Sequence, residues 1–211
     1  MLIEVQNVYK EIHGRTILKN VNLKLHGGKI YGLQGENGSG KTMFMRSLAG
    51  LIYLDEGQII INNEVLHKEI DFPKSIGVLL ENPSFLDGFT GIQNLKMLAS
   101  LKGIASEKSL KNMMHCVGLD PGDRRKYRKY SLGMKQRLGI AAALMENAEI
   151  ILLDEPFNAL DEAGKQQVES RILQMKDNNR IIVISCHDRN RLERIADVII
   201  SVDQGCLQVM E

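Results

Sequence analysis

The segment Lys29–Leu51, which reads KIYGLQGENGSGKTMFMRSLAGL, decides the fold. Its start, Lys29–Gln34, predicts a short strand, and the apolar spacing of Lys41–Leu51 predicts a helix. Between them Gly35–Thr42, GENGSGKT, satisfies the pattern G-x-x-x-x-G-K-[ST], which requires a strand before it and a helix after it. A glycine-rich turn with a chance lysine is the alternative, and the flanking elements argue against it. The segment therefore predicts a phosphate-binding loop in an α/β protein.

The chemistry of this loop follows from its residue types. Glycines permit backbone angles that turn successive N–H groups inward, and the following helix adds the positive end of its dipole. Lys41 is predicted to contact the β- and γ-phosphates of a nucleotide, and the Thr42 hydroxyl to hold Mg²⁺. The predicted nucleotide-binding residues of the loop are Gly35, Glu36, Asn37, Gly38, Ser39, Gly40, Lys41 and Thr42.

A second candidate feature is the segment Ile150–Pro156, IILLDEP, an apolar strand that ends in two carboxylates. In open α/β sheets the ligand site lies beyond the carboxyl ends of the strands, so both acids are expected to face the phosphate loop. Asp154 suits the metal, and Glu155 suits polarising the water that attacks a γ-phosphorus. Taken alone, an acidic pair after a strand is more often a solvated turn. The phosphate loop earlier in the chain favours the functional interpretation.

The rest of the chain predicts one domain with three regions of different secondary structure. A β-rich opening and a hairpin that turns at Asn62 and Asn63 precede a helical insertion. Two strongly apolar strands of a parallel sheet follow the insertion. The predicted segments are strands Leu2–Val8 and Ile17–Leu25, hairpin Gly57–Val65, helices Ile92–Lys102 and Glu107–Val117, and strands Ile150–Leu153 and Ile181–Ser185. We expect a single domain over residues 1–211, with the core and β subdomain in 1–81 and 134–211 and a helical subdomain in about 82–133.

Composition limits the function classes. The 211 residues include 44% hydrophobic ones, and 27 Lys and Arg balance 26 Asp and Glu. A net charge of +1 gives no electrostatic case for nucleic acid, so the basic run Arg124–Lys129 is interpreted as a solvated loop. The three cysteines are widely spaced and fit a reducing compartment. No signal peptide and no long apolar run is recognised, so we expect a chain that does not cross a bilayer alone.

The stretch Tyr130–Gly139, YSLGMKQRLG, narrows the class of protein. It resembles the signature motif of ABC ATPases, whose commonest form is LSGGQ. The resemblance implies that Ser131 and Gly133 contact the γ-phosphate held by a second copy, since a hydroxyl and backbone N–H groups at a helix N-terminus bind anions. Leu132 and Met134 depart from the common motif.

Two further segments occupy the places that the same family gives them. Asp161, within FNALD, matches the loop that crosses the family's dimer interface. His187 follows the apolar strand IIVIS and matches a histidine that hydrogen-bonds the γ-phosphate. A lone histidine after a strand is usually structural, but the strand end places this one at the expected ligand crevice.

Two positions differ from most members of the family. Ile12 stands where most members stack an aromatic ring on adenine, and Tyr9 could substitute, although packing is the commoner role of such a ring. Glu81, within VLLENPSF, stands where most members have a glutamine that senses the γ-phosphate and metal. A carboxylate there only accepts hydrogen bonds and adds a charge beside Mg²⁺, unless it merely solvates a loop. Together with SLGMKQRL, Glu81 resembles the ATPases of bacitracin-type and lantibiotic self-protection exporters.

The resemblance implies an α/β fold with a P-loop NTPase core, a mixed sheet, an antiparallel β subdomain and a helical subdomain. It also implies an ATPase that uses ATP and Mg²⁺, dimerises with itself through composite ATP sites and drives a separate transmembrane permease. Such a subunit is expected to be cytoplasmic, peripheral on the inner face of the cell membrane, and without a nucleic-acid partner. The alternatives are a soluble ABC-type ATPase of DNA repair or translation and a weakly hydrolysing nucleotide-dependent regulator.

Overall fold

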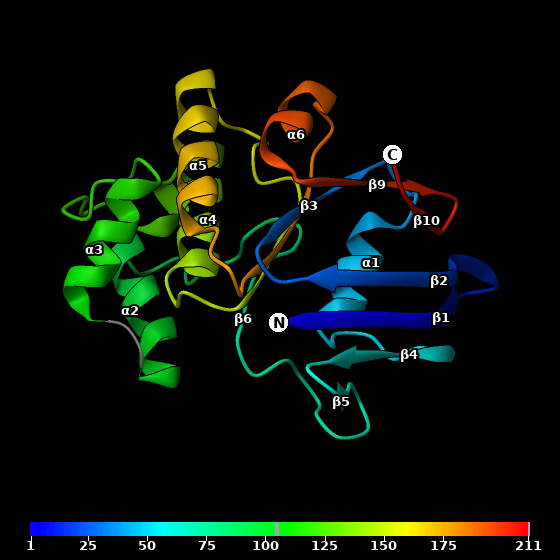
Figure 1. The fold of residues 1–211 in the computed structure, drawn as a ribbon. Helices are drawn as coiled ribbons and strands as arrows, with labels where there is room; N and C mark the ends of the chain where they lie inside the picture. The colour runs from blue at the N-terminus through cyan, green and yellow to red at the C-terminus, as the bar shows by residue number, and fades with distance from the viewer. Residues whose placement is uncertain (104–105, 211) are drawn as a thin grey trace.

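The computed structural model describes residues 1–103 and 106–210, and it contains two sheets and a helical end (Figure 1). The antiparallel sheet has the strand order β2-β1-β4-β5. Its strands are β1 (Leu2–Ile12), β2 (Arg15–His26), β4 (Glu56–Ile61) and β5 (Glu64–Val65). The β4–β5 hairpin turns at Asn62 and Asn63, as predicted, with φ of 48° and 70°. Asparagine tolerates this left-handed conformation better than most residues.

The first two strands are longer than predicted. Their pairing shifts register at several points along β1, and Asn7 and Asn20 have positive φ angles of 49° and 47°. Such bulges interrupt the alternation of apolar and polar residues. The sequence pattern therefore breaks before the strand itself ends.

The mixed sheet has the order β10-β9-β3-β8-β7-β6 and is parallel apart from β10. Its strands are β3 (Lys29–Gln34), β6 (Ile76–Leu79), β7 (Ile150–Leu153), β8 (Ile181–Ser185), β9 (Val198–Asp203) and β10 (Cys206–Val209). The bounds of β3, β7 and β8 agree with the predicted strands. Every residue of β7 and β8 is buried, as expected for a strand covered on both faces.

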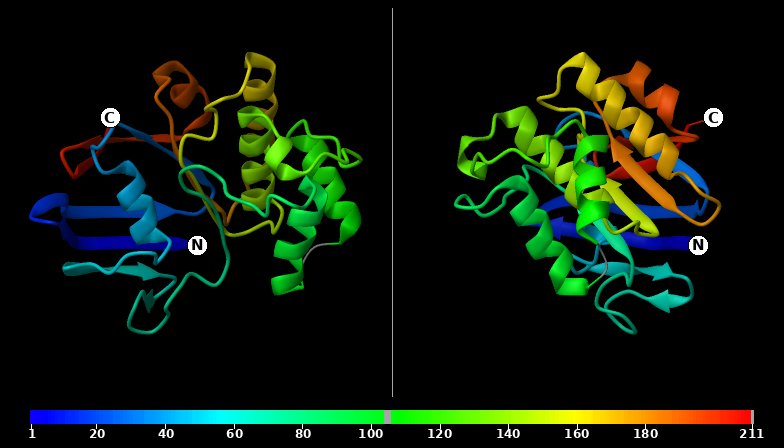
Figure 2. Two further views of the ribbon diagram at one scale, coloured as in Figure 1. Left: turned by 180° about the vertical axis from the view of Figure 1, so that it is seen from behind. Right: turned by 90° about the vertical axis from the view of Figure 1, so that its left-hand side faces the viewer.

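Helices cover both faces of the mixed sheet. Helix α1 (Lys41–Leu48) lies between this sheet and the antiparallel sheet, where Phe44, Met45 and Leu48 join one continuous core. The opposite face packs against α4 (Leu132–Leu144), α5 (Glu162–Met175) and α6 (Arg189–Ile195). Figure 2 shows these layers from behind and from one end. The predicted α/β fold class is confirmed.

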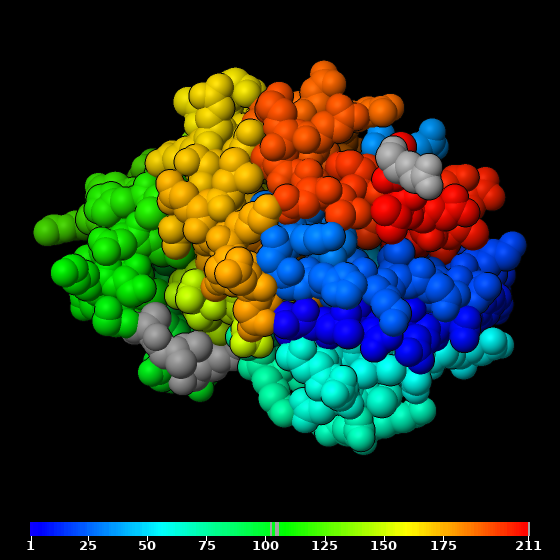
Figure 3. Space-filling model, viewed as in Figure 1, coloured from blue at the N-terminus to red at the C-terminus, as the bar shows by residue number. Residues whose placement is uncertain are grey.

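The helical end consists of α2 (Gly91–Lys102), α3 (Glu107–Cys116) and a short 3-10 helix, η1 (Tyr127–Lys129). Thr90 and Gln93 cap the start of α2 reciprocally, and Ser106 caps α3. Figure 3 shows this region at the opposite end of the molecule from the antiparallel sheet. Within residues 1–103 and 106–210, no helix combines the length and apolar character that a membrane span requires.

Candidate functional site

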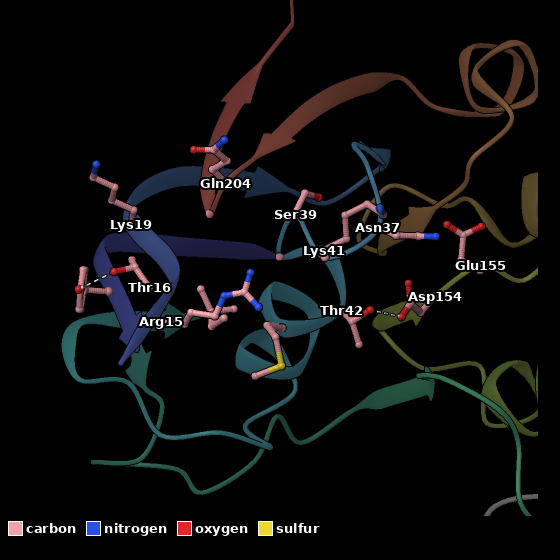
Figure 4. A pocket seen from close by; sticks show the side chains of 16 residues that line it. Arg15, Thr16, Lys19, Asn37, Ser39, Lys41, Thr42, Asp154, Glu155 and Gln204 are labelled. Carbon is pink, nitrogen blue, oxygen red and sulfur yellow. Dashed lines mark hydrogen bonds between the residues drawn. The ribbon is translucent and has the colours of Figure 1, made fainter. Parts of the chain in front are cut away.

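A cavity of about 790 Å³ lies where several parallel strands end. The loop 35–40 follows β3, the acids Asp154 and Glu155 follow β7, and His187 follows β8. Because β3, β7 and β8 are parallel neighbours, their carboxyl ends share one edge of the sheet. Figure 4 shows the loop and the acids lining this cavity, together with residues of β1, β2 and the β9–β10 turn.

Backbone geometry accounts for two of the loop glycines. Gly38 and Gly40 have φ angles of 80° and 116°, values that residues with a side chain rarely adopt. A Cβ at Gly40 would also meet the carbonyl oxygen of Ile17 at 2.9 Å. Gly40 precedes the first residue of α1, and Phe44 N donates to its carbonyl at 2.8 Å. The loop therefore brings its backbone N–H groups to the N-terminus of α1, an arrangement that suits anions.

The Lys41 ammonium lies inside this loop. Its Nζ donates to the carbonyl oxygens of Gly35 at 2.7 Å and Glu36 at 2.8 Å, and the residue is 6% exposed. Asn37 also lines the cavity. The hydroxyl of Ser39 is buried and has no hydrogen-bond partner among the described residues. A buried cation and an unsatisfied hydroxyl are groups that an oxyanion would satisfy.

Thr42 and Asp154, which the sequence predicts as metal ligands, meet in the cavity. The Thr42 hydroxyl donates to Asp154 Oδ2 at 2.5 Å, and the Ser185 hydroxyl donates to Asp154 Oδ1 at 2.5 Å. Ser185 Oγ also accepts from the backbone N–H of Glu155 at 2.8 Å. A hydroxyl and a carboxylate are oxygen ligands of the kind that Mg²⁺ prefers, so these residues fit that ion. Sequence reasoning missed Ser185, which had no signal beyond its place at the end of a buried strand.

Glu155 has a strained backbone and a carboxylate that is largely shielded from water. Its φ is 48°, an uncommon value for a residue other than glycine. Its Oε1 lies 3.1 Å from His187 Nε2, yet this buried oxygen has no properly directed hydrogen bond from the described residues. Burial raises the pKa of Glu155, while the nearby His187 and Lys41 act to lower it. A carboxyl with a raised pKa is suited to accepting a proton near neutral pH.

The predicted signature residues lie at the start of α4. Ser131 caps this helix, and its Oγ accepts from Met134 N at 3.2 Å. Leu132 is 76% exposed, which shows that the residue replacing the usual glycine points outward. Neither Ser131 nor Gly133 lines the cavity of the same copy.

Asp161 caps α5, where its Oδ1 accepts from Gly164 N and from Arg137 Nη2, each at 3.1 Å. Arg137 also donates to the carbonyl of Val117 at 2.7 Å. Arg137 therefore joins the Asp161 loop to the end of α3. Its role was not apparent from the sequence.

The structure places Glu81 beside α1. Glu81 Oε1 lies 2.6 Å from Arg46 Nη2, so its carboxylate is bonded to a cation rather than to the predicted metal residues. Tyr9 lines the cavity, whereas Ile12 does not. The Tyr9 hydroxyl lies 2.9 Å from the Thr16 hydroxyl, a hydrogen bond that fixes one edge of the ring. Sequence reasoning did not find Arg15, Lys19 and Gln204, which also line the cavity.

A phosphate-binding loop that meets a strand-terminal Asp-Glu pair at the edge of a mostly parallel sheet defines a P-loop nucleotide triphosphatase. Comparison with known proteins gives the particular family. Residues 18–158 match the family described as ABC transporter. The chain belongs to this family, as an ATP-binding subunit of the ABC class of ATPases.

Curated relatives agree with this assignment. The ABC transporter ATP-binding protein YybJ of Bacillus subtilis is 43% identical over 210 residues, which cover 100% of this chain and 96% of the relative. The bacitracin transport ATP-binding protein BcrA of Enterococcus faecalis is 38% identical, over 98% of this chain and 68% of the relative. The lantibiotic transport ATP-binding protein SrtF of Streptococcus pyogenes is 36% identical, over 97% and 88%. The predicted resemblance to bacitracin and lantibiotic proteins is confirmed.

The fold is also that of solved cassettes. An ATP-binding subunit of an ABC transporter superposes with a TM-score of 0.88 and 24% identity, covering 98% of this chain and 88% of that one. The ATP-binding cassette MJ0796, described as a dimeric post-hydrolysis state bound to ADP and Pi, superposes with a TM-score of 0.87 and 23% identity, covering 99% and 98%.

Proposed function

We propose that two copies of this chain close on two ATP molecules and that hydrolysis drives a separate transmembrane permease, which exports antimicrobial peptides or drugs. The observation that carries the proposal is the division of the site. The phosphate loop, Thr42, Asp154 and Glu155 line one cavity, whereas Ser131 and Gly133 lie outside it. A second copy can bring those two residues to the nucleotide.

In the nucleotide-binding step, the backbone of residues 35–40 surrounds the phosphates and Lys41 contacts the β- and γ-phosphates. Thr42 and Asp154 would hold Mg²⁺, which supplies positive charge to the phosphate oxygens. Ser185 keeps Asp154 in place by donating to its second oxygen. Tyr9, held by Thr16, offers the base an aromatic surface that Ile12 does not provide.

In the hydrolytic step, Glu155 accepts a proton from water as the water oxygen bonds to the γ-phosphorus and the bond to the β-phosphate oxygen breaks. The raised pKa of Glu155 supports this role, because a more basic carboxylate accepts the proton more readily. His187 orients the γ-phosphate and the attacking water, a role that its 3.1 Å distance from Glu155 supports. Lys41 balances the charge that develops on the departing ADP.

Across the dimer, Ser131 and Gly133 of one copy contact the γ-phosphate bound by the other. Asp161, which is exposed and lies at the start of α5, contacts the facing subunit. Loss of the γ-phosphate removes the contact that joins the copies. The resulting opening and closing moves a permease docked near residues 81–90.

The transport names of the relatives support a membrane partner over an ATPase of DNA repair or translation. BcrA and SrtF carry names of bacitracin and lantibiotic transport, which supports an exporter of that type, with this subunit working on the cytoplasmic face of the membrane. The helical region of about 82–133 would be the subdomain that follows the permease, and we propose no nucleic-acid partner.

A Glu155→Gln variant tests the proposal. It should bind ATP, release phosphate very slowly and form an ATP-dependent dimer, which light scattering after size-exclusion chromatography would detect. The matched control, Glu193→Gln, removes an exposed carboxylate that pairs with Arg189 and should behave as the parent. Normal phosphate release by Glu155→Gln would contradict the role of Glu155. Stimulation of the parent by DNA or ribosomes, rather than by a co-expressed permease, would contradict transport.

A further inference from the structure

Arg191, in helix α6, is a buried cation surrounded by three carboxylates. Its side chain is 3% exposed, and it donates from Nη2 to Glu162 Oε1 at 2.6 Å and from Nη1 to Glu169 Oε2 at 2.7 Å. Its Nε lies 3.8 Å from Asp188 Oδ2. Although burial acts to lower the pKa of Arg191, the hydrogen bonds and charges of the two glutamates raise it above its ordinary value, so the guanidinium stays charged. Arg191 and these three acids form what we call the Arg191 network.

The side chain of Arg191 contacts both ends of the segment that follows the acidic pair. Phe157, two residues after Glu155, has its ring centroid 5.4 Å from the Arg191 Cζ, and the face of an aromatic ring attracts a cation. Glu162 directly follows Asp161 and is the first residue of α5. Arg191 therefore holds the segment 157–162 at its beginning and at its end.

The backbone of Arg191 is bonded to the turn that carries His187. Asp188, the next residue, caps α6, and its Oδ1 accepts from Arg191 N at 3.0 Å. Helices α5 and α6 lie side by side, and the pair between Arg191 and Glu169 joins them (Figure 1). One arginine is thus bonded to the neighbour of His187 in one segment and to the neighbour of Asp161 in the other.

A second arginine holds the start of α5 from another direction. Arg137 Nη2 donates to Asp161 Oδ1 at 3.1 Å, while Arg191 donates to the adjacent Glu162. Ala159, between the ends of the segment, has a φ of 59°, an uncommon value for a residue with a side chain. The two arginines therefore hold the segment in a turned conformation that leaves the Asp161 side chain 74% exposed.

A buried ion pair often contributes nothing to stability that apolar side chains of the same volume could not contribute. Two observations point to a role in positioning. The partner Glu162 is 61% exposed, so the guanidinium reaches from the interior to a carboxylate at the surface, beside Asp161. In addition, charge-assisted hydrogen bonds fix the direction of their partners, which apolar packing does not. The Arg191 network is therefore suited to setting how two segments of the site lie relative to each other.

We propose that Arg191 is a positioning residue that fixes the segment 157–162 relative to His187, so that one copy presents Asp161 and His187 together when two copies close on ATP. The inference rests on the proposed function. It deepens that function by assigning to the Arg191 network the connection between a copy's contact with its own γ-phosphate and its contact with the facing copy. Arg191 does not line the nucleotide cavity, so its loss should leave the affinity of a single copy for ADP unchanged.

The experiment measures the ATP-dependent dimer in a Glu155→Gln background, where hydrolysis does not consume the nucleotide. Analytical ultracentrifugation with ATP and Mg²⁺ gives the dimer dissociation constant, and calorimetry with ADP gives the affinity of a single copy. Circular dichroism follows thermal unfolding separately. The principal substitution is Glu162→Gln, because it removes an exposed carboxylate and leaves Arg191 paired with Glu169 in the interior.

We expect Glu162→Gln to raise the dimer dissociation constant about fivefold, since it removes one charged pair with a buried partner. Arg191→Met removes every pair of the network and should raise the constant further, and adding Glu162→Gln to it should have no additional effect. The matched control Arg194→Met breaks a 3.6 Å pair between the same helix and Glu169 and should leave the constant unchanged. Should Arg191→Met fail to fold, the comparison of Glu162→Gln with Arg194→Met decides the outcome.

Equal dimer dissociation constants with and without Glu162→Gln would overturn the proposal, even if the unfolding midpoint fell, because a purely structural ion pair gives that combination. A matching loss of ADP affinity would also overturn it, since the network would then act on nucleotide binding by the single copy. Failure of the Glu155→Gln protein itself to dimerise with ATP would instead refute the proposed function, and it is seen before any residue of the network is changed.

Discussion

Substituting Ser185 by alanine tests whether one buried hydroxyl organises both acids of the site. Ser185 is fully buried, donates to Asp154 at 2.5 Å and accepts from Glu155 N at 2.8 Å. Ser185→Ala removes both hydrogen bonds and leaves an amide and a carboxylate oxygen without this partner. A hydrogen bond to a charged group contributes about 1.5–3 kcal/mol, and an ordinary one about 1 kcal/mol.

The two losses together should lower the free energy of unfolding by roughly 2.5–4 kcal/mol. For a domain of this size each kcal/mol corresponds to about 2–4 °C, so the midpoint of thermal unfolding should fall by roughly 5–16 °C. Asp154 would also lose one of its two hydroxyl anchors. By analogy with other partners of metal ligands, the Mg²⁺ needed for half-maximal nucleotide binding should rise about tenfold or more.

Circular dichroism measures the unfolding midpoint, and a fluorescent ATP analogue titrated with Mg²⁺ measures the metal dependence. Ser47→Ala is the matched control, because Ser47 is equally buried but donates only to Phe44 O within α1, at 2.7 Å. It should cost about 1 kcal/mol and leave the metal dependence unchanged. If Ser185→Ala were no less stable than this control, or bound nucleotide with the parent's Mg²⁺ requirement, the assigned role of Ser185 would be wrong.

Two further predictions concern the base and the nucleotide. Burial raises the pKa of Glu155 in the folded protein above its ordinary value of 4.5. Ionisation of Glu155 therefore destabilises the folded protein as the pH rises from about 4.5 through that raised pKa. The Glu155→Gln variant does not lose this stability, so its midpoint of thermal unfolding should exceed that of the parent. The difference should be absent below this pH range and should grow across it. A difference that does not change with pH would contradict the raised pKa of Glu155. Tyr9→Ala should weaken ATP binding several-fold in a calorimetric titration because Tyr9 lines the cavity, whereas Ile12→Ala should not; the reverse order would show that the base lies toward Ile12.

The parts of the fold that sequence analysis predicted best are those with unambiguous local patterns. Strands β7 and β8 were predicted with their observed bounds, because both are runs of apolar residues, ended in β8 by Ser185, and every residue in them is buried. Strand β6 was missed, since Ile76–Leu79 is short and contains Gly77. That glycine is required by packing, because a Cβ there would meet the carbonyl oxygen of Ala143 in α4. Such a contact between distant segments has no local signal.

The residues of the candidate site also differ in whether a local sequence pattern reveals them. The phosphate loop and the Asp154–Glu155 pair were found because their chemistry demands fixed residue types at fixed spacings. Ser185 and Arg46 were not found, because a serine that ends an apolar strand and an arginine on an amphipathic helix are unremarkable locally. Arg46 and Glu81 are 35 residues apart in sequence, and only the packing of α1 beside the end of β6 brings them together. Predicting the residues that support the site therefore requires the tertiary structure. The residues of the phosphate loop and the acidic pair can be predicted from the sequence alone.

The supporting residues connect the parts of the site through a continuous series of polar contacts. From His187 the polar contacts pass to Glu155, then through Ser185 to Asp154 and Thr42. Helix α1 carries Thr42 at one end and, one turn later, the arginine that holds Glu81. Because α1 is buried between two sheets, it cannot shift to absorb a change at either end. We therefore expect a change beside Thr42 to be taken up by side-chain contacts rather than by movement of the helix, and the Glu81 side chain, 60% exposed, is the most exposed of the ion-paired groups in that row.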